Sequence, residues 1–539
     1  MTSLSSTGIA SAPSEISRPK LNQPMGIRTI LIFLAIIALG LFFAAYNIYR
    51  DISAAGTPVV SILPFLLLGV ALLIALGFEF VNGFHDTANA VATVIYTHSL
   101  APPVAVVWSG CFNFLGVLLS SGAVAFGIIS LLPVELILQV GSEAGFAMVF
   151  AMLIAAIIWN LGTWWLGLPA SSSHTLIGSI IGVGIANALM RGRDGTSGVD
   201  WSKAIEIGYA LLFSPLVGFI CAAILLILMK FVIRKHELYA EPKGKAAPPL
   251  WVRGLLVFTS AGVSFAHGSN DGQKGMGLIM LILIGTVPTA YALNRTLPAA
   301  YVPSFVQDSV AASKVVEAKA AGYSVFGDPR PAVTNYVTSH QINEGTFPSL
   351  AALIRDIANQ VQSYGTLAQI PAAQVGNTRN DMYLASEAIR FLQKDKAAEL
   401  SKQDIATLAA YKKNLDNATK FIPDWVKVSV ALALGLGTMI GWKRIVVTVG
   451  EKIGKQHLTY GQGAAAEIVA MGTIAAADSF GLPVSTTHVL SSGVAGTMAA
   501  NGSGVQISTI RSIGLAWVLT LPCAMALSAF LFFIFRHLF

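Results

Sequence analysis

The chain has 539 residues, of which 54% are hydrophobic and 11% are charged, with a formal net charge of +7. Soluble domains carry roughly one-quarter charged residues, so this composition excludes an ordinary soluble protein and indicates one that crosses a membrane many times. The basic residues collect in short loops beside apolar segments, as the positive-inside rule describes, and we expect no nucleic-acid partner. All three cysteines fall in apolar segments, which predicts no disulfide or metal–thiolate framework.

Apolar stretches recur along the chain at the length of about 20 residues that a membrane-spanning helix needs. The first, 29–48, is longer than the roughly 7–15-residue core of a signal peptide, so we expect a retained helix with a cytoplasmic N-terminus. Two others, 58–97 and 254–293, are about twice the needed length and carry polar clusters, which predicts a broken helix or a pair of segments in each. The remaining candidates are 104–131, 147–165, 176–190, 204–233, 425–441, 457–480, 485–500 and 512–535.

Two pairs of phrases recur in the same order. "NGFHDTANA", which contains Asp86, has a counterpart in "HGSNDGQKG", which contains Asp271. "GLPASSSHTL", which begins at Gly167, has a counterpart in "GLPVSTTHVL", which begins at Gly481. This order indicates that one half of the protein is a duplicate of the other.

The domain organisation follows from the repeat. We predict an all-α polytopic membrane protein of two inverted-topology repeats with broken helices, two re-entrant hairpins at the Gly-Leu-Pro phrases, and an extra N-terminal transmembrane helix. Alternating crossings place the basic loop in the cytoplasm and a polar helical insert outside, although the basic residues of 191–203 then fall on the wrong side for the charge rule. The predicted segments are 1–53 (N-terminus and extra helix), 54–233 (first repeat), 234–253 (basic loop) and 254–539 (second repeat, interrupted by the insert 294–423).

Inverted repeats with polar clusters at matched positions are typical of secondary transporters, which bind substrate near the membrane midplane. An unpaired aspartate at that depth costs about 2.5–3.5 kcal/mol, so Asp86 and Asp271 are candidates for substrate binding. The alternative is that they only join helices to one another. We expect Asn82, Asn89 and Asn270 to help position or coordinate the substrate.

A run of hydroxyl side chains follows each Gly-Leu-Pro. The proline stops one helix and the hydroxyls can cap the next, leaving backbone N–H groups and the positive end of the helix dipole for an anion. A capped helix start at the bilayer surface is the alternative. The histidines that follow can donate to the anion or relay protons, or simply pack. These residues are Ser171, Ser172, Ser173 and His174 in the first copy and Ser485, Thr486, Thr487 and His488 in the second.

These motifs resemble the Pit family of inorganic phosphate transporters, specifically its bacterial low-affinity proton-coupled branch. The resemblance covers roughly 55–293 and 420–539 and includes "FNFLGVLL", "NLGTWWLGLPASSSHTLIGSIIG", "NDGQKGMGLIMLILIG" and "ALALGLGTMIGWKRI". It implies phosphate symport across the bacterial inner membrane with a co-transported proton. It also implies a cargo that can be a neutral complex of phosphate with a divalent metal, and Asp86 and Asp271 would then ligate the metal.

Two departures from the family pattern bear on the coupling ion. Sodium-coupled relatives resemble Gly-Ala-Asn-Asp-Val-Ala-Asn in both copies, whereas this chain reads "GFHDTAN" and "GSNDGQK". His85 therefore replaces an asparagine, and Lys274 stands where another is expected. An ammonium beside Asp271 can substitute for a bound sodium ion, and a histidine titrates near neutral pH. Both changes favour proton over sodium coupling.

Two alternative functions stay open. The first is transport of sulfate or another oxyanion, since the same donors accept either ion. The second is a membrane receptor or enzyme that works through the outer insert 294–423, although that insert has one histidine, His340, and no Gly-rich phosphate loop. We expect a transporter and not an enzyme, without a resident cofactor, whose partners are inorganic phosphate and membrane lipid. A homo-oligomer is compatible with the sequence.

Overall fold

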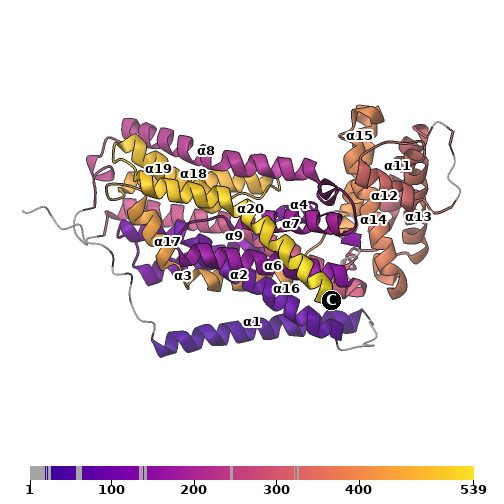
Figure 1. The fold of residues 1–539 in the computed structure, drawn as a ribbon, viewed down its shortest axis with the longest axis horizontal. Helices are drawn as coiled ribbons and strands as arrows, with labels where there is room; N and C mark the ends of the chain where they lie inside the picture. Colours follow the sequence, from indigo (N-terminus) through magenta and orange to yellow (C-terminus); the bar gives the residue numbers. More distant parts are fainter. Residues whose placement is uncertain are drawn as a thin grey trace, which may run out of the picture.

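A computed structural model describes residues 19, 21, 26–55, 63–132, 137–138, 142–242, 247–320, 322–323 and 327–538. Over these residues the protein is helical and contains no β-strand beyond one isolated bridge (Figure 1). The helices of the first half are α1 Ile27–Ala54, α2 Leu63–Tyr96, α3 Pro102–Leu119, α4 Ala123–Ile129, α6 Glu143–Trp165, α7 Ser172–Met190 and α8 Trp201–Val232. Those of the second half are α9 Leu250–Thr286, α10 Pro288–Tyr291, α16 Asp424–Thr438, α17 Lys443–Val447, α18 Tyr460–Ser479, α19 Thr486–Asn501 and α20 Ile507–Leu538.

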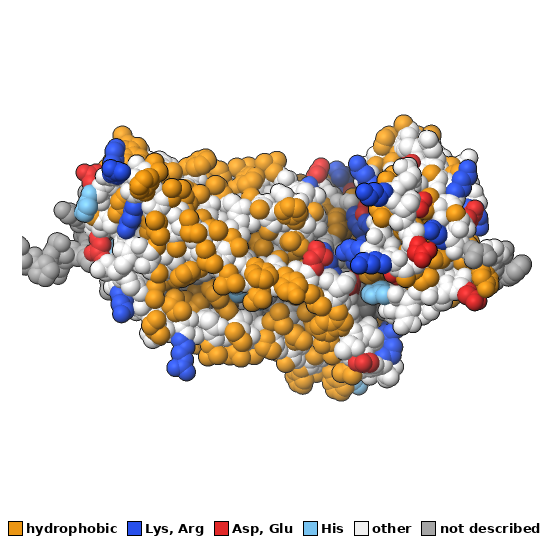
Figure 2. All heavy atoms as spheres, turned by 90° about the horizontal axis from the view of Figure 1, so that it is seen from above, with side chains coloured by type: hydrophobic (Ala, Val, Ile, Leu, Met, Phe, Trp, Pro, Cys, Tyr) orange, Lys and Arg blue, Asp and Glu red, His pale blue; other side chains and the backbone are white. Residues whose placement is uncertain are grey.

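The helical body has the composition of a membrane protein. Seven described helices are long and apolar enough to cross a membrane, or up to eight if the bent pair ending in α16 counts as one. Hydrophobic side chains cover the face seen in Figure 2 along the length of this body, while charged side chains gather at its two ends and on the insert. The extra helix α1, predicted at 29–48, packs against α16 and α10.

The prediction of broken helices is wrong for the polar clusters. Each cluster lies within one continuous helix, in α2 and in α9, which run for 34 and 37 residues. Neither cluster contains a proline, so the backbone keeps its own hydrogen bonds, and Asp86 and Asp271 find partners on neighbouring helices. A real break occurs elsewhere: the predicted span 104–131 divides into α3 and α4 at Gly122, whose φ of 85° is left-handed.

The two halves exchange helices reciprocally. Helix α7 of the first half packs against α20 of the second, and α19 of the second packs against α8 of the first. In the same way α3 packs against α9, and α16 packs against α2. Such an exchange is what a twofold relation between the halves requires, while their opposite orientation in the membrane remains a prediction.

Glycines allow the closest of these crossings. A Cβ atom added to Gly116 of α3 would collide with the carbonyl oxygen of Phe265 in α9, and one added to Gly437 of α16 would collide with that of Phe80 in α2. The two collisions occupy matching positions in the two halves. Small residues of this kind bring helix backbones together in membranes, where packing replaces the hydrophobic effect as the attraction between helices.

Each Gly-Leu-Pro phrase forms a tight turn between two helices. Gly167 and Gly481 adopt left-handed φ values of 68° and 65°, which only glycine reaches without strain. The turn after Gly167 joins α6 to α7, and the turn after Gly481 joins α18 to α19. These two hairpins are at the predicted positions; how deeply their tips enter the membrane stays a prediction.

The insert forms a separate helical bundle at the end of the molecule opposite to α17 (Figure 1). Its chain ends meet where the backbone N–H of Asn294 donates to the carbonyl of Ala418 over 2.8 Å. Buried aromatic and aliphatic side chains such as Phe305 and Ile354 form its core. Its helices are α11 Tyr301–Ala318, α12 Arg330–Ser339, α13 Thr346–Tyr364, α14 Ala372–Leu392 and α15 Lys402–Thr419.

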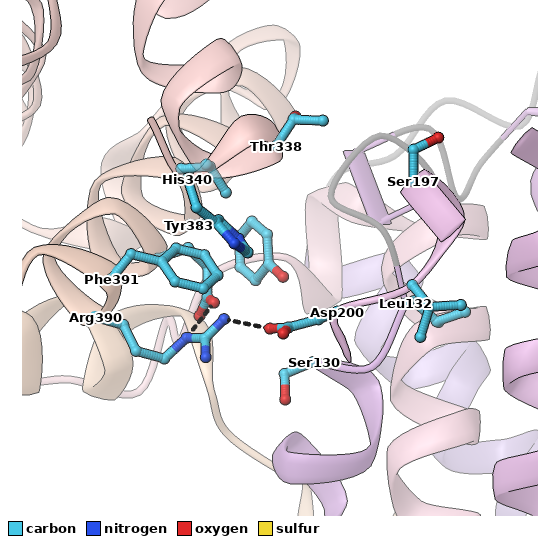
Figure 3. Close-up of a pocket in the computed structure, with 12 residues that line it drawn as sticks. Ser130, Leu132, Ser197, Asp200, Thr338, His340, Tyr383, Arg390 and Phe391 are labelled. Carbon is cyan, nitrogen blue, oxygen red and sulfur yellow. Dashed lines mark hydrogen bonds and ion pairs between the residues drawn. The ribbon is translucent and has the colours of Figure 1, made fainter. Parts of the chain in front are cut away.

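An ion pair fastens the insert to the membrane body. Arg390 of α14 lies 2.8 Å from Asp200, which caps α8, and 2.7 Å from Glu387 (Figure 3). Burial of Asp200 opposes its ionisation, but the Arg390 guanidinium outweighs burial and lowers the pKa of this carboxyl. The pair borders a small cavity into which His340 and Tyr383 also extend.

The close crossings give a test of the packing. We expect Gly116→Ala and Gly437→Ala each to lower the free energy of unfolding by about 1–3 kcal/mol, because the added methyl group meets backbone and not a flexible side chain. The matched control is Gly162→Ala in α6, where a Cβ atom would meet nothing within 4 Å. The measurement is the thermal unfolding midpoint of the purified protein in detergent. Equal midpoints for all three variants would show that these crossings are not close-packed.

Candidate functional site

The two predicted aspartates meet at the tip of the first hairpin. Ser172, the first residue of α7, donates from Oγ to Asp86 Oδ2 over 2.6 Å, and the same Oγ lies 3.2 Å from Asp271 Oδ2. All three side chains are buried. A serine hydroxyl has one proton to donate, so it cannot satisfy both carboxylates at once. The structure therefore places two acceptor groups around one donor.

The second hairpin reaches Asp86 as well. Thr487 donates from Oγ1 to Asp86 Oδ1 over 2.6 Å, and His85 Nδ1 lies 3.0 Å from the same oxygen. His85 Nε2 is 3.1 Å from Thr163 Oγ1 of α6. Asp86 is thus held by residues of both halves of the protein, and the structure brings together side chains 401 positions apart in the sequence.

Lys274 pairs with the other aspartate. Its Nζ lies 2.5 Å from Asp271 Oδ2 and 2.5 Å from Ser173 Oγ, and the lysine is fully buried. Ser173 in turn donates to the carbonyl oxygen of Val484 in the second hairpin, over 2.7 Å. A buried ion pair needs further hydrogen bonds to its remaining atoms, and the hydroxyl of the first hairpin supplies one of them to Lys274, whereas Asp271 Oδ1 has no hydrogen-bond partner.

One site residue, His267, was not predicted. It lies one helical turn before Asp271 in α9, and its Nδ1 is 2.8 Å from Asn113 Oδ1. Its Nε2 faces the two carboxylates, at 3.6 Å from Asp271 Oδ2 and 4.0 Å from Asp86 Oδ2, and makes no hydrogen bond. The signal was present, because His267 is the first residue of the second repeated phrase and its i,i+4 spacing puts it on the face of Asp271.

The remaining three hydroxyls of the two hairpins are of two kinds. The expected capping is confirmed at Ser171, which accepts from the backbone N–H of His174, and at Ser485, which accepts from that of His488. The hydroxyl of Thr486 is buried and has no hydrogen-bond partner. The first turns of α7 and α19 both reach Asp86, through Ser172 and Thr487, and Thr486 with its free hydroxyl is the first residue of α19.

The three asparagines predicted to help bind the substrate differ in what they contact. Asn270 holds the second hairpin, since its Nδ2 donates to the carbonyl of Leu482 and its Oδ1 accepts from the backbone N–H of Val484. The amide of Asn82 lies 3.5 Å from Glu79 Oε2, one turn earlier in α2, and not against Asp86. The side chain of Asn89 lies outside the described part of the structure.

The paired histidines stand beside the site. The rings of His174 and His488 are 4.5 Å apart, and His488 stacks on Trp517 of α20 at 4.0 Å. His174 Nδ1 is 2.9 Å from Ser171 Oγ. The interactions of these two rings join the hairpins to each other, which fits the packing alternative, and a role in proton relay remains a prediction.

Chemically, the site combines groups for an anion with groups for a cation. Two helix N-termini and a free hydroxyl suit an oxyanion, whereas Asp86, His267 and Asp271 each offer a ligand atom within 4.8 Å of the others. A site of this composition can hold an anion together with a positively charged ion.

Comparison with known proteins connects these features to one family. The profile of the phosphate transporter family (PHO4) matches residues 82–528. The chain is 44% identical to the low-affinity inorganic phosphate transporter PitA of Escherichia coli (strain K12) over 499 residues, covering 87% of this chain and 96% of PitA. It is 42% identical to PitB of the same organism over 495 residues, with the same coverage of each chain.

A solved structure titled "The sodium-dependent phosphate transporter" covers 88% of this chain and 100% of its own, at 19% identity and a TM-score of 0.48, which is too remote to carry an argument. The relatives are named as transporters, so the chain is a transporter and not an enzyme. From the extent of these matches, the chain belongs to the phosphate transporter family.

Proposed function

We propose that this protein is a secondary symporter that carries inorganic phosphate inward across a bacterial inner membrane. The names of its relatives support phosphate as the substrate, and a tetrahedral oxyanion suits two converging helix N-termini. The observation that carries the proposal is the contact of both hairpin tips with Asp86 and of one tip with Asp271. Carboxylates beside an anion site repel the anion unless a cation enters with it.

A divalent metal is one such cation. Asp86, His267 and Asp271 supply two carboxylate oxygens and an imidazole nitrogen, all buried, a donor set that suits Mn²⁺ or Zn²⁺ better than Ca²⁺. We propose that the metal travels as part of the cargo, in a neutral complex with hydrogen phosphate. Thr486 and the N-terminal amides of α7 and α19 then donate to the phosphate oxygens.

A proton is proposed as the driving ion. The Lys274 ammonium supplies beside Asp271 the positive charge that a bound sodium ion would otherwise provide. His85, in contact with Asp86, adds an imidazole that can accept or donate a proton. These two residues support proton coupling over sodium coupling, in line with the departures from the sodium-coupled pattern.

The direct test is uptake of radiolabelled phosphate by liposomes that contain only this protein. We expect uptake in sodium-free buffer, acceleration by an alkaline interior, and no further acceleration by sodium. Excess unlabelled phosphate is expected to abolish the signal, and excess sulfate to leave most of it. Equal competition by sulfate would favour the oxyanion alternative. A requirement for sodium would refute proton coupling but leave phosphate as the proposed substrate.

Thr486→Val tests the anion site, because it removes the unpartnered hydroxyl while keeping the shape of the side chain. Losing a donor to a bound anion costs about 1.5–3 kcal/mol, so we expect the half-saturating phosphate concentration to rise about 10- to 150-fold. The matched control is Thr497→Val on the same helix, whose hydroxyl donates to the backbone of Val494. An unchanged concentration dependence in Thr486→Val would exclude this hydroxyl from the site.

His267→Ala tests the metal. If a metal–phosphate complex is carried, removing one of three ligands should raise the metal concentration needed for half-maximal uptake at least about 10-fold, as loss of even an outer-shell partner does. The measurement is phosphate uptake against buffered Mn²⁺, Zn²⁺ or Mg²⁺, with His537→Ala at the exposed end of α20 as the control. Wild-type uptake that is indifferent to a metal chelator would show that phosphate travels without metal.

A further inference from the structure

A third acidic residue lies buried near the site and has no assigned role. Glu79 is on α2, two helical turns before Asp86, and its side chain is 0% exposed. Its carboxyl group lies against Gly275 of α9, the residue after Lys274, and a Cβ atom at that position would collide with it. The absence of a side chain at Gly275 is what makes room for this carboxyl group between the two helices.

The hydrogen bonding of Glu79 is incomplete. Its Oε1 has no partner in hydrogen-bond geometry, although the amide of Gly275 lies close by. Its Oε2 accepts one long bond of 3.5 Å from Asn82, whose own Oδ1 is also without a partner. An ionised carboxylate buried with so few donors costs several kcal/mol, whereas a protonated one gains a donor of its own.

Two other acids of the membrane helices, the buried Glu467 and the half-buried Asp478, behave differently. Glu467 on α18 accepts from the hydroxyls of both Thr93 and Thr259, one for each oxygen. Asp478, on the same helix, accepts from Ser269 over 2.7 Å and from Gln273 over 2.7 Å. Both oxygens of each of these carboxyl groups have a side-chain hydrogen-bonding partner, which Glu79 Oε1 lacks.

Charge balance connects Glu79 to the substrate site. Among the helices packed against α2, helix α9 carries the charged groups that act on Glu79, namely Asp271 and Lys274. Lys274 is already paired with Asp271 at 2.5 Å. When Glu79 is protonated, one ammonium faces one carboxylate. When Glu79 is ionised, two carboxylates compete for the same ammonium, and the pairing at the substrate site is weakened.

We propose that Glu79 carries the proton that is transported with phosphate, an assignment that rests on the proposed proton coupling. The step is an acid–base reaction at one oxygen: the Glu79 carboxylate takes up a proton from the outer solution, holds it as an O–H while phosphate crosses, and releases it to the inner solution. Protonation keeps Lys274 on Asp271, so the loaded site forms only when proton and phosphate are both present.

The test uses the variant Glu79→Gln, which mimics the protonated acid. It compares phosphate exchange, which requires only binding and movement of phosphate, with phosphate accumulation, which also requires coupling to protons. We expect phosphate exchange, with equal pH and phosphate on both sides of liposomes, to stay within about twofold of wild type, since exchange needs no net proton movement. We expect accumulation driven by one pH unit, about 10-fold for one proton per phosphate, to disappear. The control is Glu467→Gln, an equally buried acid, which should keep both. Glu79→Asp, which retains an acid, should restore accumulation.

Each outcome decides between the proposals. If wild type exchanges phosphate but does not respond to the pH gradient, proton coupling fails and the role of Glu79 fails with it. If wild type responds and Glu79→Gln accumulates phosphate equally well, only the assignment of Glu79 is wrong. The assignment is also wrong if Glu79→Gln loses exchange together with accumulation, or if Glu79→Asp behaves like Glu79→Gln.

Discussion

Hydrocarbon offers no hydrogen bonds, so each polar group at the centre of this bundle must find its partner inside the protein. The two carboxylates Asp86 and Asp271 make this requirement severe, because both lie against the single hydroxyl of Ser172. One lysine, Lys274 of α9, pairs with Asp271. The arrangement of helices can be understood from this requirement. A hairpin brings the N-terminal end of a helix to the aspartates, with the hydroxyls of its first turn and its free backbone N–H groups. The middle of an unbroken helix could offer only side chains there, because its backbone N–H groups are already bonded.

The reciprocal packing of the halves delivers those donors from two directions. Asp86 belongs to the first half and is held by Ser172 of its own half and Thr487 of the other. The two hairpins are alike in sequence but not in use: Ser172 contacts the carboxylates, whereas its counterpart Thr486 has a free hydroxyl. The repeated phrases predict a symmetric frame, within which residues such as Lys274 make the two sides of the site chemically different.

Much of this could be predicted from sequence because the signals repeat. The duplicated phrases located the aspartates, the hydroxyl caps and the hairpins. What failed was local: the polar clusters in α2 and α9 suggested helix breaks, although nothing in them interrupts backbone hydrogen bonding. His267 and Glu79 were missed for another reason. Glu79 lies outside the repeated phrases, and His267 opens the second phrase at the position where the first has Asn82. The importance of both depends on contacts across helices, with Asn113 and Gly275, which a single sequence does not display.

The insert between α10 and α16 also has a consequence for assembly. Its two chain ends meet at the hydrogen bond between Asn294 and Ala418, so the covalent connections to the membrane helices lie next to each other, and Arg390 adds the ion pair with Asp200. The entropy lost in closing so long a loop is offset by the packing of the insert's own core, so it does not destabilise the membrane helices. The chain therefore leaves α10 and returns to α16 as it would across a short turn, and outside its contacts with the membrane helices the sequence of the insert can change without altering how α9 and α16 come together.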